Sequence, residues 1–184
     1  MTRNIIAIAF VFLLTGMAAT GHADTASKGA VLTISGNIEK SNRGKFDPFS
    51  DAFLKHHEKS FEKAFSVSAE MLAALTQHKV SASVENWPKK IVLHGPLLRD
   101  VLALAGANGK PLTIYALDGY GAEFSLEKLA AHEWVLATHS DGNALAIGGR
   151  GPLWLGYDTG GKTLTEEEES GWVWAAFYIE VGEK

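Results

Sequence analysis

The chain of 184 residues contains no cysteine. Disulfide bonds are therefore excluded, and so is a thiolate ligand for a metal ion. In an oxidising compartment such a protein must be stabilised by the burial of its side chains alone.

Several functional signals are also missing. The sequence carries 17 basic and 21 acidic residues, a formal net charge of −4, and no large basic patch, so no nucleic-acid partner is expected. Ser81, Ser83 and Ser140 lie outside any G-x-S-x-G motif, so no serine nucleophile is indicated. No stretch after residue 23 is apolar enough to span a membrane.

The first 23 residues have the pattern of a secretory signal peptide. Residues 1–4 include a basic residue, residues 5–14 are apolar, and Gly21-His22-Ala23 is a small-x-small cleavage site. An uncleaved anchor is the alternative, but the apolar run is shorter than the roughly 20 residues that span a bilayer. We expect cleavage near Ala23 and a single domain over residues 24–184. The lack of cysteine favours a bacterial periplasm over a eukaryotic extracellular space.

The remaining pattern predicts an α+β fold, because short strands and short helices follow one another without a regular βαβ rhythm. The clearest helix opens at Gly95-Pro96 and stops at Gly106. Expected strands cover residues 31–38, 78–84, 91–94, 112–116, 134–138, 153–157 and 172–181. Other expected helices cover residues 51–63, the segment of Met71, Leu72 and Leu75 capped by Ser66 or Ser68, and residues 125–129.

Three stretches carry a family pattern. HGPLLRDVLALAGANGKPLTIYALDGYGAEFSLEKL covers residues 94–129, VLATHSDGNAL covers 135–145, and GGRGPLWLGYD covers 148–158. In this order they resemble the oxidoreductase molybdopterin-binding domain of the sulfite-oxidase fold family, over roughly residues 64–181. The resemblance implies mixed β-sheets with a barrel-like core and a few short helices.

The resemblance also identifies a departure. In catalytic members of the family, the molybdenum-binding cysteine lies in the loop after the strand that here covers residues 80–84. The matching stretch is Glu85-Asn86-Trp87-Pro88, with Asn86 nearest the cysteine position. A neutral amide is a poor molybdenum ligand compared with a thiolate, so molybdenum is not expected.

Small cysteine-lacking exported proteins of this type are similar to periplasmic pterin-binding regulators of the PruR kind. That similarity implies a pterin as non-covalent ligand. It also implies a protein partner, the periplasmic domain of a membrane-bound cyclic-di-GMP enzyme.

A pterin is a flat bicycle with a donor-rich edge, so its site needs aromatic faces and a few polar groups. The sequence offers a carboxylate, an amide and an indole in one loop, an Asp-Gly-Tyr turn in a second, an arginine between glycines in a third, and two residues of nearby strands. These candidates are Glu85, Asn86, Trp87, Asp118, Tyr120, Arg150, His139 and Trp154.

Each candidate also has a structural interpretation. Trp87 can cover the edge of the core, Asp118-Gly119 is ordinary turn chemistry, and Arg150 can lie in water. An isolated histidine such as His139 is more often structural, and Trp154 alternates with neighbours in the manner of a core residue, as does Trp174. The acidic run 166–169 is interpreted as a solvated loop.

Three hypotheses follow for function. The first is an exported pterin-binding sensor without catalysis. The second is a periplasmic oxidoreductase that depends on the molybdenum cofactor without thiolate ligation. The third is an interaction domain that binds no small molecule.

Overall fold

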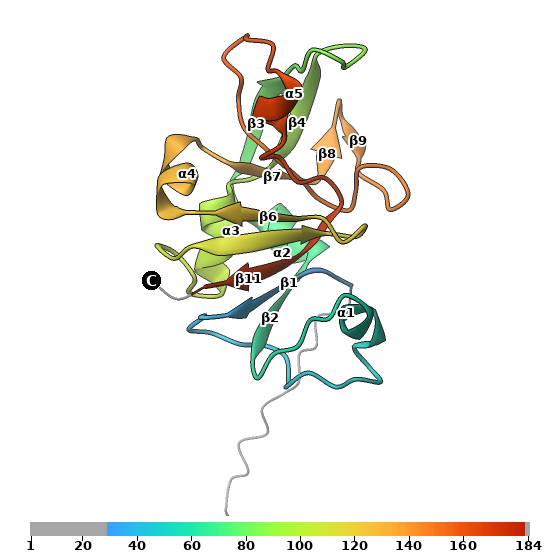
Figure 1. The fold of residues 1–184 in the computed structure, drawn as a ribbon, viewed down its shortest axis with the longest axis vertical. Helices are drawn as coiled ribbons and strands as arrows, with labels where there is room; N and C mark the ends of the chain where they lie inside the picture. Colours follow the sequence, from blue (N-terminus) through green and yellow to red (C-terminus); the bar gives the residue numbers. More distant parts are fainter. Residues whose placement is uncertain (1–28, 183–184) are drawn as a thin grey trace, which may run out of the picture.

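The computed structural model describes residues 29–182, so the predicted signal peptide over residues 1–23 lies outside the described residues. Figure 1 shows an elongated molecule in which the sheets follow one another along the long axis. None of the helices in the described part of the chain is long and apolar enough to cross a membrane.

A five-stranded sheet forms the lower half of the molecule in Figure 1. Its strands are, in order across the sheet, β2 (Ala64–Ser68), β1 (Ala30–Gly36), β11 (Ala176–Val181), β5 (Leu112–Ala116) and β6 (Gly121–Phe124). β1 and β11 run parallel, with Thr33 opposite Tyr178, and the other neighbours are antiparallel. The first and last described strands therefore pair in the interior of this sheet.

Two smaller sheets lie above it. One has the order β3 (Gln77–Ala82), β4 (Ile91–Pro96), β8 (His139–Ser140) and β9 (Asn143–Ala144), and the other pairs β7 (Val135–Ala137) with β10 (Trp154–Gly156). β4 crosses β7 in close backbone contact. A Cβ added at Gly95 would lie only 2.3 Å from the carbonyl oxygen of Leu136. Only glycine permits this approach.

The sheets do not close into a barrel within residues 29–182. The core expected from the resemblance is therefore built from several sheets without a closed barrel. The α+β class, with several sheets and a few short helices, is confirmed.

The five helices of the described chain are short. They are α1 (Ala52–His56), α2 (Ala69–Ala74), α3 (Leu98–Leu104), α4 (Leu126–Ala131) and α5 (Glu166–Glu169). Ser68 caps α2 and Ser125 caps α4, as their positions in the sequence predict. Thr165 and Glu168 form a reciprocal capping box at the start of α5.

Several expected boundaries are wrong. Pro96 pairs with Gln77 at the end of β4 instead of opening a helix, and α3 begins two residues later. The expected helix over residues 51–63 ends at His56. The acidic run over residues 166–169 is the helix α5 instead of a loop, because the capping box satisfies its first turn.

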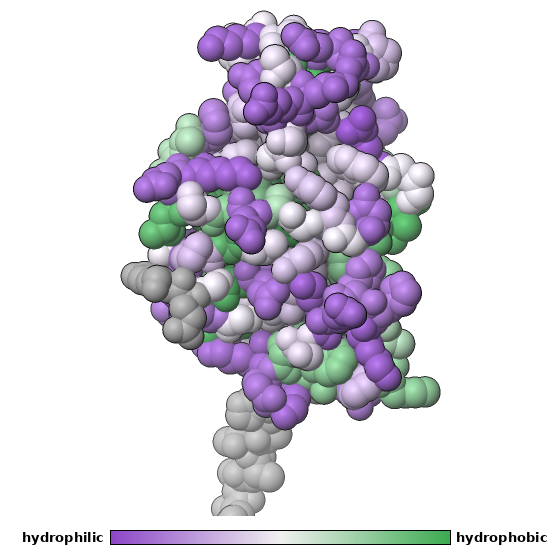
Figure 2. Space-filling view, viewed as in Figure 1, coloured by the Kyte–Doolittle hydropathy of each residue, from purple (hydrophilic) through white to green (hydrophobic). Residues whose placement is uncertain are grey.

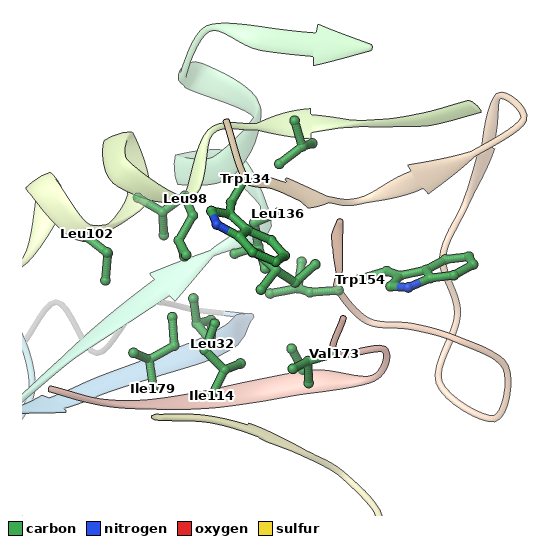
Figure 3. Packing of buried hydrophobic residues seen from close by; sticks show 14 of the residues in the cluster. Leu32, Leu98, Leu102, Ile114, Trp134, Leu136, Trp154, Val173 and Ile179 are labelled. Carbon is green, nitrogen blue, oxygen red and sulfur yellow. The ribbon is translucent and has the colours of Figure 1, made fainter. Parts of the chain in front are cut away.

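The main core lies between the five-stranded sheet, α3 and β7. Figure 3 shows aliphatic side chains from these elements in contact, with Trp134 among them. The labelled members from the sheet, helix and β7 are Leu32, Ile114, Ile179, Leu98, Leu102 and Leu136, all buried. This core positions the loops that lie at the other side of β10.

Candidate functional site

Arg150 lies where three separate loops meet. Its guanidinium carbon lies 4.5 Å from the ring centroid of Trp154 and 5.4 Å from that of Trp87. A cation over the face of an indole is attracted by the ring quadrupole. Three of the predicted site residues are thus brought together by the fold.

The backbone explains this placement. Arg150 lies within a tight loop in which the N–H groups of its neighbours Gly149 and Gly151 both donate to the carbonyl of Ala146. The Arg150 carbonyl then accepts the N–H of Ala175, which ties this loop to the segment that enters β11. Ala175 has a φ of 55°, the left-handed region that an alanine rarely adopts.

The loop of Trp87 is held from the other side. The N–H of Glu85 donates to the carbonyl of Leu164, and that of Leu164 donates to Ser83. The side-chain amide of Asn86 donates to Glu166 at the start of α5. Asn86 therefore attaches this loop to α5.

Trp172 completes an aromatic cluster that the sequence did not identify. The ring centroid of Trp87 lies 5.3 Å from that of Trp154 and 6.1 Å from that of Trp172. Trp172 lies within the expected strand over residues 172–181, but β11 begins only at Ala176. The positive φ of Ala175 separates the segment from the strand, so Trp172 faces the cluster and Trp174 is 41% exposed. The expectation that Trp174 belongs to the core is wrong.

Two hollows flank Arg150. The first, here called the tryptophan hollow, has a volume of about 310 Å³, and the second, the acidic hollow, has about 430 Å³. The tryptophan hollow is lined by Trp87, Pro88, Lys89, Ile91, Ser140, Asp141, Arg150 and Trp154. The acidic hollow is lined by Ala116, Asp118, Tyr120, Arg150, Glu166, Glu169, Ser170, Trp172 and Trp174.

Carboxylates dominate the acidic hollow. Glu169 lies 3.7 Å from the Arg150 guanidinium, too far for a hydrogen bond but close enough for Coulomb attraction. Asp118 accepts the backbone N–H of Tyr120 at 3.0 Å, which is the predicted turn chemistry. The Tyr120 hydroxyl donates to the carbonyl of Ser170 at 2.7 Å and so connects this turn to the end of α5.

The tryptophan hollow has a paired charge on its rim. Lys89 donates to Asp141 at 2.6 Å, and the Val92 N–H donates to the same carboxylate at 2.8 Å. These hydrogen bonds, that from Lys89 foremost, lower the pKa of Asp141 below its ordinary value. Asp141 is therefore ionised at neutral pH.

Two buried hydrogen-bond donors in the cluster have no acceptor. The indole Nε1 atoms of Trp154 and Trp172 are buried, and neither has a hydrogen-bond partner within the described chain. A buried donor without an acceptor costs about 1–3 kcal/mol. Trp154 lines the tryptophan hollow and Trp172 lines the acidic hollow, but their Nε1 atoms are themselves covered, so an acceptor would reach them only after the surrounding side chains shift.

Three predicted residues line neither hollow: Glu85, Asn86 and His139. Glu85 is exposed and lines neither hollow. His139 precedes Ser140, which lines the tryptophan hollow, and neighbouring residues of a strand point to opposite faces. His139 instead accompanies His94, with ring centroids 5.8 Å apart, and contacts the Thr138 hydroxyl at 2.8 Å. Burial, helped by Lys79 and His139, lowers the pKa of His94.

The donor set of the site does not fit molybdenum. The chain offers no thiolate, and Asn86 is engaged with Glu166. Across residues 29–182 no group of three or more histidine, aspartate or glutamate side chains is arranged to hold a metal ion.

The chain matches no family model and no curated protein sequence. Among solved structures it is similar to the sulfane dehydrogenase SoxCD from Paracoccus pantotrophus, with a TM-score of 0.52 and 19% sequence identity. The similarity covers 83% of this chain and 38% of that chain, so this chain spans well under half of the enzyme chain. It supports a sulfite-oxidase-like fold, as the sequence motifs predict.

Proposed function

We propose that this protein is an exported, periplasmic pterin-binding protein that relays ligand occupancy to a membrane-bound partner and catalyses no reaction. The observation that carries the proposal is the cluster of Trp87, Trp154, Trp172 and Arg150, in which two buried indole N–H groups have no acceptor.

The chemistry of a pterin complements this cluster. Its flat bicycle offers a π-face to an indole that lines either hollow, and its carbonyl and ring nitrogens are acceptors for the Nε1 group of Trp154 or Trp172 once a side-chain shift exposes that group. Its exocyclic amine and ring N–H are donors, for which Asp118 and Glu169 of the acidic hollow are acceptors. The Arg150 guanidinium can bond the carbonyl or an oxygen of the tail.

The dimensions agree with a ligand of this size. Sites for small molecules usually have volumes of about 300–1,000 Å³, and each hollow lies in that range. The partner proposed from the family resemblance is the periplasmic domain of a membrane-bound cyclic-di-GMP enzyme.

Mass spectrometry of the small molecule released from natively purified protein tests the proposal, with molybdenum quantified in the same sample. We expect a pterin without molybdenum. Molybdopterin with stoichiometric molybdenum would replace the proposal by an oxidoreductase, and the absence of any bound molecule would leave an interaction domain.

Asp118→Asn tests the acceptor role on the donor edge of the ligand. Loss of the charged acceptor should weaken binding of the released pterin tenfold or more, since a charge-assisted hydrogen bond contributes about 1.5–3 kcal/mol. Asp158→Asn is a matched control, because Asp158 also accepts a backbone N–H two residues on, that of Gly160, but lines neither hollow. Equal affinities for the two variants would assign Asp118 to its turn alone.

A further inference from the structure

Large apolar side chains are exposed around the acidic hollow. Tyr120 and Trp174 line the hollow and are 46% and 41% exposed. Ile147 is 75% exposed in the loop that leads to Arg150. Phe53 of α1, 50% exposed, completes the set, which we call the apolar rim.

Contacts link the segments that carry these residues. Phe53 packs against Phe177, with ring centroids 5.1 Å apart, and Phe177 follows Trp174 by three residues. The carbonyl of Arg150 accepts the N–H of Ala175, so the Ile147 loop is tied to the same segment. The carbonyl of Ala175 accepts the N–H of Leu117, which brings in the turn of Asp118 and Tyr120.

Figure 2 shows two separate hydrophobic areas toward the right-hand side, one near the level of the β9–β10 loop and one over α1, with hydrophilic surface between them. Exposed apolar surface rimmed by polar residues is typical of protein interaction sites, and tryptophan and tyrosine are frequent anchors of such sites.

Negative charge lies next to Tyr120 and Trp174, the two members of the apolar rim that line the acidic hollow. All four residues of α5 are glutamates, its last turn has no basic residue, and Glu166 and Glu169 line the hollow. In a symmetric dimer through this surface the same patch would meet itself, so α5 would face its own acidic copy. Anionic lipid headgroups would be repelled in the same way.

We infer that the apolar rim and α5 together form a docking surface for a folded protein whose contact patch is apolar at its centre and basic at its edge. This inference deepens the proposed function, because it places the partner at the mouth of the ligand site. It does not require the ligand to be a pterin.

In-cell photocrosslinking tests the surface. The full chain carries a photoreactive phenylalanine at Phe53 or Ile147, and at Leu126 as a control. Leu126 is 46% exposed but belongs to α4, on the left of the molecule in Figure 1, opposite α1. We expect positions 53 and 147 to crosslink to the same protein and position 126 not to do so.

The crosslinked protein is then purified and titrated with variants. Ile147→Ser and Phe53→Ser should each weaken its binding tenfold or more, and Leu126→Ser should leave it unchanged. Glu167→Lys should weaken it several-fold, with a smaller effect at high salt, because exposed charges are screened. Phosphatidylglycerol vesicles should not bind the wild type.

The inference would be overturned if positions 53 and 147 gave no crosslink, or if they crosslinked to a second copy of this chain. Binding of the wild type to the vesicles would also overturn it, as would a partner that binds both serine variants with wild-type affinity. Pterin content is measured in Ile147→Ser, whose residue 147 lines neither hollow. If the wild-type protein contains no pterin but Ile147→Ser still loses partner binding, only the proposed ligand is rejected. If Ile147→Ser keeps both its pterin and its partner binding, only the docking surface is rejected.

Discussion

Two buried tryptophans differ in whether a hydrogen-bond acceptor is present for the indole N–H. Trp134, 5% exposed, donates its Nε1–H to the carbonyl of Lys128 at 3.0 Å and packs edge-on against Phe124. Trp154, 3% exposed, has no acceptor and lies beneath the Arg150 cation. Figure 3 shows Trp134 among aliphatic side chains, whereas Trp154 points away from them.

In the core around Trp134 the buried indole donor has an acceptor, whereas in the cluster around Arg150 the buried indole donors have none. An unpaired buried donor lowers stability, so it persists where another molecule supplies the acceptor or where the geometry of the fold imposes it. Because Trp172 shares the property and the neighbourhood, the open donors mark the region rather than one side chain.

Truncation of Trp134 should give the largest change in stability. Trp134→Ala removes a buried ring of the core and should lower the free energy of unfolding by about 3–5 kcal/mol, measured by urea denaturation. Ligand affinity of the fraction that remains folded should be close to that of the wild type, since residue 134 lines neither hollow. A loss below about 1 kcal/mol would contradict the assignment of Trp134 to the core.

The core should also set the alkaline limit of stability. Burial raises the pKa of Tyr178 from 10.0 to about 12, although its 2.5 Å hydrogen bond with Ser35 works in the opposite direction. Between these values the unfolded chain loses the proton while the folded protein keeps it, so stability falls by up to about 1.4 kcal/mol per pH unit. Below pH 10 this contribution is fully present.

Denaturation from pH 9 to 12 measures the fall. It should be smaller in Tyr178→Phe than in Tyr157→Phe, a control at a half-buried tyrosine. Identical slopes would show that Tyr178 does not govern the alkaline limit.

Matched phenylalanine variants compare the two tryptophans directly. Trp134→Phe leaves the Lys128 carbonyl without its donor, whereas Trp154→Phe removes a donor that has no acceptor. Trp134→Phe should therefore be the less stable variant by about 1–3 kcal/mol in ligand-free protein. Equal losses would mean that the Trp154 N–H is satisfied in solution.

The smallest expected effect concerns stacking at the site. Trp87→Ala should remove about 0.5–1.5 kcal/mol of interaction beyond the buried area, and so weaken pterin binding several-fold or more. Tyr157→Ala is the control, because Tyr157 also packs against Trp172, at 5.1 Å, but lines neither hollow. Unchanged affinity in folded Trp87→Ala would show that Trp87 does not contact the ligand.

The sequence predicted features that depend on neighbouring residues. Of the two caps expected for the helix of Met71 and Leu72, Ser68 is the one that forms. Ser125 begins the expected helix over residues 125–129 as its cap, and Asp141-Gly142, a typical turn dipeptide, forms a turn in which both residues have positive φ. The meeting of Trp87, Arg150 and Trp154 was only a hypothesis drawn from a resemblance, since no local pattern relates residues so far apart in the sequence.

Other features had no local signal. The face of His139 follows from the pairing of β8 with β4, which sets His139 beside His94. The inclusion of Trp172 depends on the left-handed backbone of Ala175, which is held on both sides by hydrogen bonds to Arg150 and Leu117. These partners are distant in sequence, so only the assembled fold stabilises that conformation.

Composition and short motifs determined the α+β class, the lack of thiolate chemistry, the capped helices and the tight turns, because each depends on residues close in the chain. Tertiary packing decided which tryptophans keep an acceptor, where Arg150 and the glutamates of α5 meet, and which apolar side chains stay exposed. These properties depend on strand register and on contacts between distant segments, and the free energy of the whole fold selects them.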